Sequence, residues 1–402
     1  MKKFFVIVLM LVAVSGNGQW VQMSNGMGNN KTITSFVVSG TNIFAGTYGS
    51  GIYLSTNYGV SWTAVNNGLT GYALNVYSLT NIGTNLFAGT FGSGVFKSTN
   101  NGTSWLEINN GLPSYNNILS FTVSGTNIFS GTMSGGVFKS TNYGANWDGG
   151  GLLGVDFNAL KVLGTNIFAG TNKGVYLSTD NGIHWTAAGY NPIYDFKTIA
   201  VLGGNLFVGG TGVFYTSNNG ASWISANYGL PNSIVYSLII SGTNMFAGIS
   251  SGCGVYLSTN NGTNWLSKNQ GFSNVPGVYA VVVTNNYIFA GTDSSVWRRS
   301  LSEIIGVQNI STEIPSAFSL KQNYPNPFNP RTVVSFSLPV GGDMSIKVYD
   351  VQGREVQTLV KERLSAGNYE VTFDGSGLTS GVYFYRMQAG GYTETKRMIL
   401  IK

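Results

Sequence analysis

Carboxylates are the side chains whose type and position come nearest to a catalytic arrangement in this sequence. Inverting hydrolysis of a glycosidic bond needs two opposed carboxyl groups about 6.5–9.5 Å apart, one as general acid and one as general base. Asp156 and Asp195 lie in consecutive turn-rich segments and best meet this requirement. The other carboxylates between residues 19 and 300 are Glu107, Asp148, Asp180 and Asp293. Because carboxylates are so sparse, catalysis is only a secondary hypothesis.

The chain contains one cysteine, Cys253, and one histidine, His184. A lone cysteine excludes an intrachain disulfide, so stability must come from packing and backbone hydrogen bonds. His184 lies in a turn, and the sequence shows no partner for it in acid–base catalysis. We predict no cofactor and no metal site.

Aromatic residues occur among asparagines in the segments that connect repeated units. Aromatic faces combined with amide donors and acceptors suit sugars or peptides. Packing between units is the alternative explanation for each of these rings, and both remain open. The candidate ligand-binding residues are Tyr72, Tyr115, Phe157, Tyr194, Phe196, Tyr228 and Phe272.

A repeat of about 40 residues carries all of these candidates. Its clearest element is Ser-Thr-Asn-x-Gly-x-x-Trp, whose six tryptophans are spaced by 43, 42, 38, 38 and 42 residues. A second element, Asn-Ile-Phe-Ala-Gly-Thr or a close variant, occurs seven times, starting at 42, 85, 127, 166, 205, 244 and 287. Repeats of this length with four short strands each are typical of β-propeller blades.

The mismatch between six tryptophan boxes and seven copies of the second element predicts how the ring closes. The last unit ends near Ser300, after its third strand, and residues 19–23 resemble a fourth strand. We expect Trp20 to occupy the position of the missing tryptophan. The predicted fold is therefore all-β, with a seven-bladed propeller over 19–300.

The chain begins with Lys2 and Lys3, an apolar run over 4–14, and small residues up to Gly18. This layout predicts a secretory signal peptide over 1–18 with cleavage near Gln19, and the apolar run is too short to span a membrane. Only 9% of the residues are charged, and the basic residues of the propeller are scattered. This distribution gives no indication of a nucleic-acid partner.

The 40-residue period stops after Ser300, and residues 301–316 read as a linker. From 317 to 402, short runs of alternating apolar residues with glycine-containing turns predict a small β-sandwich.

The tryptophan boxes resemble the Asp-box repeats of sialidase-type and sortilin-type propellers. The resemblance implies a turn between the third and fourth strands, in which the Asn or Asp accepts backbone hydrogen bonds, the Gly has a positive φ and the Trp packs between blades. Five boxes carry Asn, so calcium binding is not expected. The matching structural residues are Asn57, Trp62, Asn100, Trp105, Asn142, Trp147, Asp180, Trp185, Asn218, Trp223, Asn260 and Trp265.

The same resemblance bears on catalysis. Sialidases hold the substrate carboxylate with an arginine cluster, whereas the first arginine here is Arg298. A sialidase is therefore excluded. The enzyme alternative that remains is a glycoside hydrolase similar to the xyloglucan-cleaving propeller endoglucanases, with Asp156 and Asp195 as its carboxylates.

The C-terminal segment resembles the sorting domain of proteins exported by the type IX secretion system of Bacteroidetes and related bacteria. The matching stretches are 324–330, Tyr349-Asp350 with Gly353, 381–385 and 396–402. The resemblance implies passage through the periplasm, recognition by the type IX machinery, and either release or attachment to surface lipopolysaccharide. Together these features predict a secreted or cell-surface binding protein with a carbohydrate or protein ligand. A role in docking another protein during assembly is one form of the same prediction.

Overall fold

The computed structural model describes residues 19–402 apart from residues 29, 115, 190–193, 302–303, 305, 312, 365 and 376. The predicted signal peptide, 1–18, and Tyr115 lie outside the described residues. The chain divides into two compact units, Trp20–Ile310 and a C-terminal unit from Ser311 to Lys402. Nearly all regular structure in both units is β-strand, which confirms the predicted all-β class.

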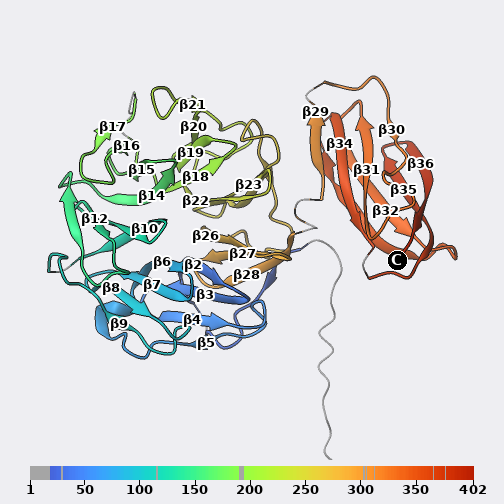
Figure 1. The fold of residues 1–402 in the computed structure, drawn as a ribbon. Helices are drawn as coiled ribbons and strands as arrows, with labels where there is room; N and C mark the ends of the chain where they lie inside the picture. The colour runs from blue at the N-terminus through green and yellow to red at the C-terminus, as the bar shows by residue number, and fades with distance from the viewer. Residues whose placement is uncertain are drawn as a thin grey trace, which may run out of the picture. The chain divides into compact units, whose positions relative to one another are not determined.

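The described residues of the first unit form seven four-stranded antiparallel sheets, which are the blades of a propeller (Figure 1). Blade one contains β2 (Ile33–Ser39), β3 (Asn42–Thr47), β4 (Gly51–Ser55) and β5 (Thr63–Ala64). Blade two contains β6 (Val76–Ile82), β7 (Asn85–Thr90), β8 (Gly94–Ser98) and β9 (Leu106–Glu107), and the 3-10 turn η1 (Gly71–Leu74) precedes it. Blade three contains β10 (Ile118–Ser124), β11 (Asn127–Thr132), β12 (Val137–Ser140) and β13 (Asp148–Gly151).

Blades four to seven continue the same order. Blade four contains β14 (Phe157–Leu163), β15 (Asn166–Thr171), β16 (Gly174–Ser178) and β17 (Thr186–Ala187). Blade five contains β18 (Thr198–Leu202), β19 (Asn205–Gly210), β20 (Gly212–Thr216) and β21 (Ile224–Ser225). Blade six contains β22 (Val235–Ser241), β23 (Asn244–Ile249), β24 (Gly254–Ser258) and β25 (Leu266–Ser267). Blade seven contains β26 (Val278–Val283), β27 (Tyr287–Thr292), β28 (Val296–Ser300) and β1 (Val21–Gln22).

The first strand of each blade lies innermost and contacts the first strands of both neighbouring blades. These contacts run in turn through β2, β6, β10, β14, β18, β22 and β26 and return to β2, so the blades form a closed ring. In blade seven, β1 pairs with β28, and Val21 lies opposite Arg298. The N-terminal end of the described chain and its last blade therefore share one sheet.

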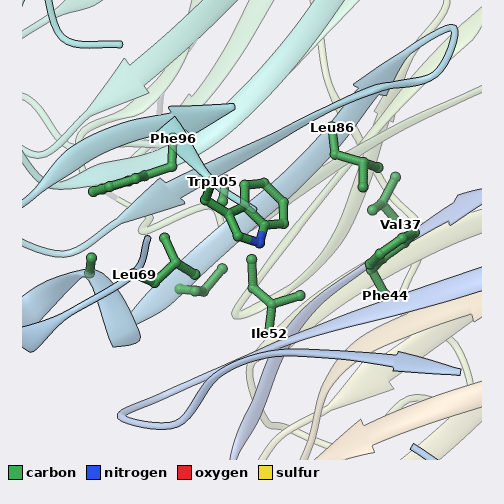
Figure 2. Close-up of a cluster of buried hydrophobic side chains, with 10 residues drawn as sticks. Val37, Phe44, Ile52, Leu69, Leu86, Phe96 and Trp105 are labelled. Atoms are coloured by element: carbon green, nitrogen blue, oxygen red, sulfur yellow. The ribbon is translucent and has the colours of Figure 1, made fainter. Parts of the chain in front are cut away.

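The blades are held together by apolar side chains packed between neighbouring sheets. Between blades one and two, Phe44, Ile52 and Trp105 belong to one buried cluster (Figure 2). The phenylalanine of each second strand is buried, and burying such a side chain contributes about 1.5–3 kcal/mol. The repeated Asn-Ile-Phe-Ala-Gly-Thr element therefore supplies the core between blades.

The glycine of that element is required by close packing. A Cβ atom on Gly89 would lie 2.4 Å from Cγ2 of Ile118, the first residue of the next inner strand. Gly46 faces Val76 in the same way, with 2.8 Å to Cγ1. Any larger residue at these positions would push the blades apart.

The C-terminal unit contains two four-stranded sheets. One has the order β29 (Gln308–Ser311), β34 (Gly367–Asp374), β31 (Arg331–Leu338) and β30 (Ser319–Leu320). The other has the order β33 (Glu355–Leu364), β32 (Gly342–Tyr349), β35 (Gly381–Ala389) and β36 (Tyr392–Leu400).

The interior of the C-terminal unit is marked by Tyr385, which is fully buried. Its hydroxyl donates to the Lys321 carbonyl at 2.8 Å and accepts from the Asn323 N–H at 2.8 Å. Burial raises the pKa of Tyr385 to about 12. The phenol therefore stays protonated and can serve as a hydrogen-bond donor at neutral pH.

The segment predicted as a linker, 301–316, contains buried side chains and one strand. Ile304 is buried in the core of blade seven, Val307 is also buried, and residues 308–311 form β29. The boundary between the two units falls within this strand. The predicted linker therefore contains the boundary between the units together with two buried apolar side chains.

Candidate functional site

The two ends of the ring differ in the kind of connection they carry. The hairpins between first and second strands, and the tryptophan boxes between third and fourth strands, lie at one end, called here the box end. The connections between second and third strands, and those leading from one blade to the next, lie at the other end, called here the loop end. This follows from the antiparallel order of strands within each blade.

At the box end, the Asn or Asp of every box accepts a backbone hydrogen bond. Asn57 Oδ1 accepts from the Ser61 N–H at 2.9 Å, and Asp180 Oδ1 accepts from the His184 N–H at 2.9 Å. The same bond is made by Asn100, Asn142, Asn218 and Asn260. Gly59 has a φ of 80° and the preceding Tyr58 a φ of 53°, so the turn needs left-handed backbone at two consecutive residues.

The box tryptophans join neighbouring blades through their indole N–H groups. Trp105 Nε1 donates to the Val65 carbonyl at 2.8 Å, and Trp147 donates to the Ile108 carbonyl at 2.8 Å. In each case the acceptor lies three residues after the tryptophan of the preceding blade. Trp62, Trp223 and Trp265 follow the same rule.

Trp20 makes the bond that this rule requires for ring closure. Its Nε1 donates to the Lys268 carbonyl at 2.6 Å, and Lys268 lies three residues after Trp265. Its backbone N–H donates to the Gln270 carbonyl at 2.8 Å. Trp185 differs, because its Nε1 donates to Gly182 within its own turn at 3.0 Å. The preceding outer strand, β13, has the sequence Asp-Gly-Gly-Gly, and two of its glycines have positive φ.

Two of the aromatic candidates from the sequence are core residues. Phe157 and Phe196 are 0% and 2% exposed, so neither presents a face to a ligand. Phe157 begins an inner strand and packs edge-on against Trp185, with ring centroids 5.5 Å apart. For these two residues the binding interpretation is wrong, because their side chains fill the space above the glycines of the neighbouring blade.

The other described candidates are scattered around the ring. Phe272 stacks on Trp20 at 5.1 Å between ring centroids and is a packing residue. Tyr228 is 78% exposed and lies in the connection from blade five to blade six, at the outer rim, where its carbonyl accepts from the Trp265 N–H next to the outermost strand β25. Tyr72 in η1 and Tyr194 before β18 are exposed at the loop end. Tyr194 stacks on Phe214 of β20, three blades away from Tyr72.

Asp156 and Asp195 are both engaged by neighbouring polar groups. The Asp156 carboxylate accepts from Ser134 at 3.1 Å and from the Asn172 amide at 2.9 Å. Asp195 accepts from the Asn158 amide at 2.8 Å and pairs with Lys197 at 2.6 Å. These contacts tie the loop-end connections of blades three to five together.

The structure identifies a set of residues that the sequence predictions missed. In six inner strands a register shift follows the first residue, so the second residue bulges from the ladder. Such bulges redirect a side chain. Lys197 precedes β18 at the corresponding place. These ring positions, all half-buried, are Thr34, Tyr77, Leu119, Asn158, Lys197, Tyr236 and Tyr279.

Tyrosines occupy the ring positions of blades two, six and seven. Tyr236 and Tyr279, from blades six and seven, meet edge to face with ring centroids 5.0 Å apart. Tyr77 of blade two stacks on Phe91 at 5.5 Å and contacts Tyr48 at 6.3 Å. These five rings are called the aromatic arc. It spans blades six, seven, one and two at the loop end.

Two tyrosines of the arc, Tyr77 and Tyr279, keep their phenolic protons at neutral pH. Burial raises the pKa of Tyr279, and the Asp293 carboxylate and Tyr236 add to this shift. Burial and the neighbouring Tyr48 raise the pKa of Tyr77. These hydroxyl groups are therefore hydrogen-bond donors as well as acceptors.

The opposite part of the loop end is polar. The polar arc consists of Asn158 and Lys197 at ring positions, with Asp195 between them, on blades four and five. A signal for both arcs exists in the sequence, because most inner strands begin with an apolar residue, a variable residue, and then Ser, Thr or Ala. The variable residue is the one that the bulge exposes.

Among the described residues, no group of three or more His, Cys, Asp or Glu side chains could hold a metal ion. Within the same residues, no helix has the length and apolar character needed to cross a membrane.

Comparison with protein families gives one match, and it lies at the C-terminus. A family described as secretion system C-terminal sorting domain matches residues 322–402. A search of curated proteins gave no match. The sorting domain indicates export to the cell surface or the extracellular space.

Solved structures similar to this chain include β-propellers, all at low identity. YCF48 from Cyanidioschyzon merolae is 13% identical, with a TM-score of 0.54, covering 70% of this chain and 98% of that one. YCF48 bound to D1 peptide is 12% identical, with a TM-score of 0.56, covering 70% of this chain and 96% of that one. The extracellular domain of the putative hybrid two-component system BT4673 from B. thetaiotaomicron is 12% identical, with a TM-score of 0.59, covering 96% of this chain and 59% of that one.

At such identities the likeness concerns the fold alone. The N-terminal unit is a β-propeller, and the C-terminal unit matches the secretion-system sorting domain.

Proposed function

We propose that this protein is a binding protein of the cell surface or extracellular space, which holds a carbohydrate or protein ligand at the loop end of its propeller. The aromatic arc carries this proposal. Half-buried tyrosines on neighbouring blades are concentrated at one end of a rigid ring, and binding residues are commonly displayed on loops in this way. The box turns at the other end support the resemblance to Asp-box propellers.

The sorting domain supports the export route that forms part of the same proposal. The type IX machinery recognises residues 317–402 after the signal peptide, 1–18, directs the chain to the periplasm, and the product is released or attached to lipopolysaccharide. Cell fractionation tests this route. Deleting 317–402 should leave the propeller in the periplasm, and finding the truncated chain outside the cell would contradict it.

We further propose that the propeller is not an enzyme. Both oxygens of Asp156 and both of Asp195 already have polar partners, which suits carboxylates that stabilise loops. The alternative is a glycoside hydrolase of the xyloglucanase type. Release of reducing sugar by the mature chain, abolished in Asp156→Asn or Asp195→Asn, would establish that alternative.

A protein ligand has one point of support outside the chain. YCF48, which shares the propeller fold, has been solved bound to D1 peptide. For the present chain, that complex supports only the general idea that a ring of this architecture can take a peptide.

The experiment for the binding proposal is an array of glycans and surface proteins, probed with the mature chain and two variants. Tyr77→Ala changes the aromatic arc, and Tyr228→Ala changes an exposed ring at the outer rim. We expect a ligand whose binding is lost in Tyr77→Ala and retained in Tyr228→Ala. A ligand retained by both variants would place the binding site away from the aromatic arc.

A further inference from the structure

We infer that the two arcs of the loop end form one site for an uncharged oligosaccharide. Its sugar rings stack on the aromatic arc, and its hydroxyl groups bond to the polar arc. This inference rests on the proposed function and names the ligand class of the same site.

The aromatic arc supplies the stacking surface. Tyr236 and Tyr279 come from neighbouring inner strands, and Tyr77 lies two blades further round the ring. Tyr48 is 58% exposed, so part of the arc is open to solvent. A pyranose ring has an apolar C–H face rimmed by hydroxyl groups, and a tyrosine offers the matching apolar face with a polar tip.

The separation of the tyrosines favours an oligosaccharide over a single sugar as the ligand. One group of rings lies on blades six and seven, and the other lies at blades one and two. Thr34 occupies the ring position between them and directs its hydroxyl to the Gly46 and Val76 carbonyls. Two aromatic groups separated by a small residue suit two sugar units of one oligosaccharide.

The charges around the site balance, which favours an uncharged ligand. The accessible charged residues described in the loop-end connections are Lys31, Asp156, Lys173, Asp195, Lys197 and Asp293, three of each sign. Lys197 pairs with Asp195 at 2.6 Å, and Lys31 donates to Ser50 at 2.9 Å. Binding sites for acidic ligands instead contain a cluster of arginine or lysine side chains without balancing carboxylates.

The polar arc has the groups that recognise hydroxyls. The Asn158 side-chain nitrogen donates to the Asp195 carboxylate at 2.8 Å and to the Phe196 carbonyl at 3.0 Å. These two bonds fix the plane of the amide, and with it the direction of the side-chain oxygen. Amide and carboxylate groups held in this way can bond to sugar hydroxyls without first being ordered.

The test is calorimetric titration of the mature chain, 19–402, with uncharged hexasaccharides. The panel contains cellohexaose, xylohexaose, mannohexaose, laminarihexaose, maltohexaose and fully N-acetylated chitohexaose, with hexagalacturonate as the charged comparison. We expect at least one uncharged member to bind, and Tyr77→Ala and Tyr279→Ala each to weaken it about tenfold or more. Affinity should change little between about 0.05 and 0.5 M NaCl, because no ion pair forms.

Controls separate loss of contact from loss of fold. Tyr228→Ala should bind as the parent does, and Tyr77→Phe should retain most of the affinity if stacking dominates. Each variant is also followed by thermal unfolding. If Tyr77→Ala unfolds, Tyr77→Phe and Tyr279→Ala still test the site.

Three results would overturn the inference. These are no binding by any uncharged hexasaccharide, preference for hexagalacturonate, or binding unaffected at Tyr77 and Tyr279. If a protein ligand from the array loses binding in Tyr77→Ala while no glycan binds, the proposed function stands and the glycan inference fails. If no ligand of either kind responds to Tyr77→Ala, both fail.

Discussion

The box end and the loop end of the ring are made by the same blades, yet one is nearly uniform and the other varied. Every box turn repeats the same backbone bond, and most box tryptophans bond to the preceding blade by the same rule. At the loop end, the ring positions carry Thr, Tyr, Leu, Asn and Lys. The box residues form the same turn and the same bonds between blades, so their types are restricted. The ring positions bulge out of the strand ladder, so many residue types fit there.

The largest expected effect is a loss of stability at the box end that has no equal at the loop end. Trp105→Ala should lower the free energy of unfolding by about 3–5 kcal/mol, because it empties the core between blades one and two. Tyr77→Ala should cost about 1 kcal/mol, because this ring is half-buried. Urea unfolding of both variants checks the comparison, and equal losses would contradict a division of roles between the two ends.

The second prediction tests the contact between second strands and inner strands. Gly89→Ala should cost about 1–3 kcal/mol, because its Cβ would lie 2.4 Å from Ile118. Gly170 is the matched control, since its nearest neighbour, Phe196 Cβ, would lie at 3.2 Å. Gly170→Ala should be less destabilising in thermal unfolding. The reverse order would mean that close packing does not explain the repeated glycine.

The third prediction uses the exception among the box tryptophans. Trp147→Phe should destabilise the ring by about 1–3 kcal/mol, because the Ile108 carbonyl loses its partner in the core. Trp185→Phe should cost less, because its bond to Gly182 lies within one turn. Denaturant midpoints measured side by side decide this. A larger loss for Trp185→Phe would show that the local bond matters more than the bond between blades.

The smallest expected effect is a pH dependence of Tm that arises from the one box with Asp in place of Asn. The His184 backbone N–H, and then the His184 side chain, lower the pKa of Asp180 from 3.8 to about 2. A lowered folded-state pKa stabilises the fold above about pH 4, and this contribution is lost as the pH falls toward 2. The Tm difference between the parent and Asp180→Asn should therefore shrink over that range.

Asn142→Asp is the matched change for the acidic box. It should introduce a smaller acid-sensitive contribution in blade three, because Asn146 stands there in place of His184. A Tm difference between the parent and Asp180→Asn that stays constant from pH 5 to pH 2 would contradict this account.

Much of the fold follows from short-range patterns. The box turns follow from Asn, Gly and Trp at fixed spacing, because a side-chain acceptor and a residue tolerant of positive φ define the turn locally. The repeated apolar second strand predicts a sheet covered on both faces. Short-range patterns do not predict the position of a residue whose surroundings come from another blade. Phe157 and Phe196 look like loop aromatics in sequence but fill the space above glycines of the neighbouring blade.

The sequence by itself determined the all-β class, the repeating blade, the turn chemistry of the boxes and the match of the C-terminal segment to a sorting domain, because each depends on residues close together in the chain. Only the tertiary structure decided which aromatic residues are exposed together. Tyr77, Tyr236 and Tyr279 lie on the same arc of one ring because β26 and β2, about 240 residues apart in sequence, become neighbours when the ring closes. A bulge in each strand then turns the side chain out of the ladder, and ring closure and bulge register depend on contacts between blades.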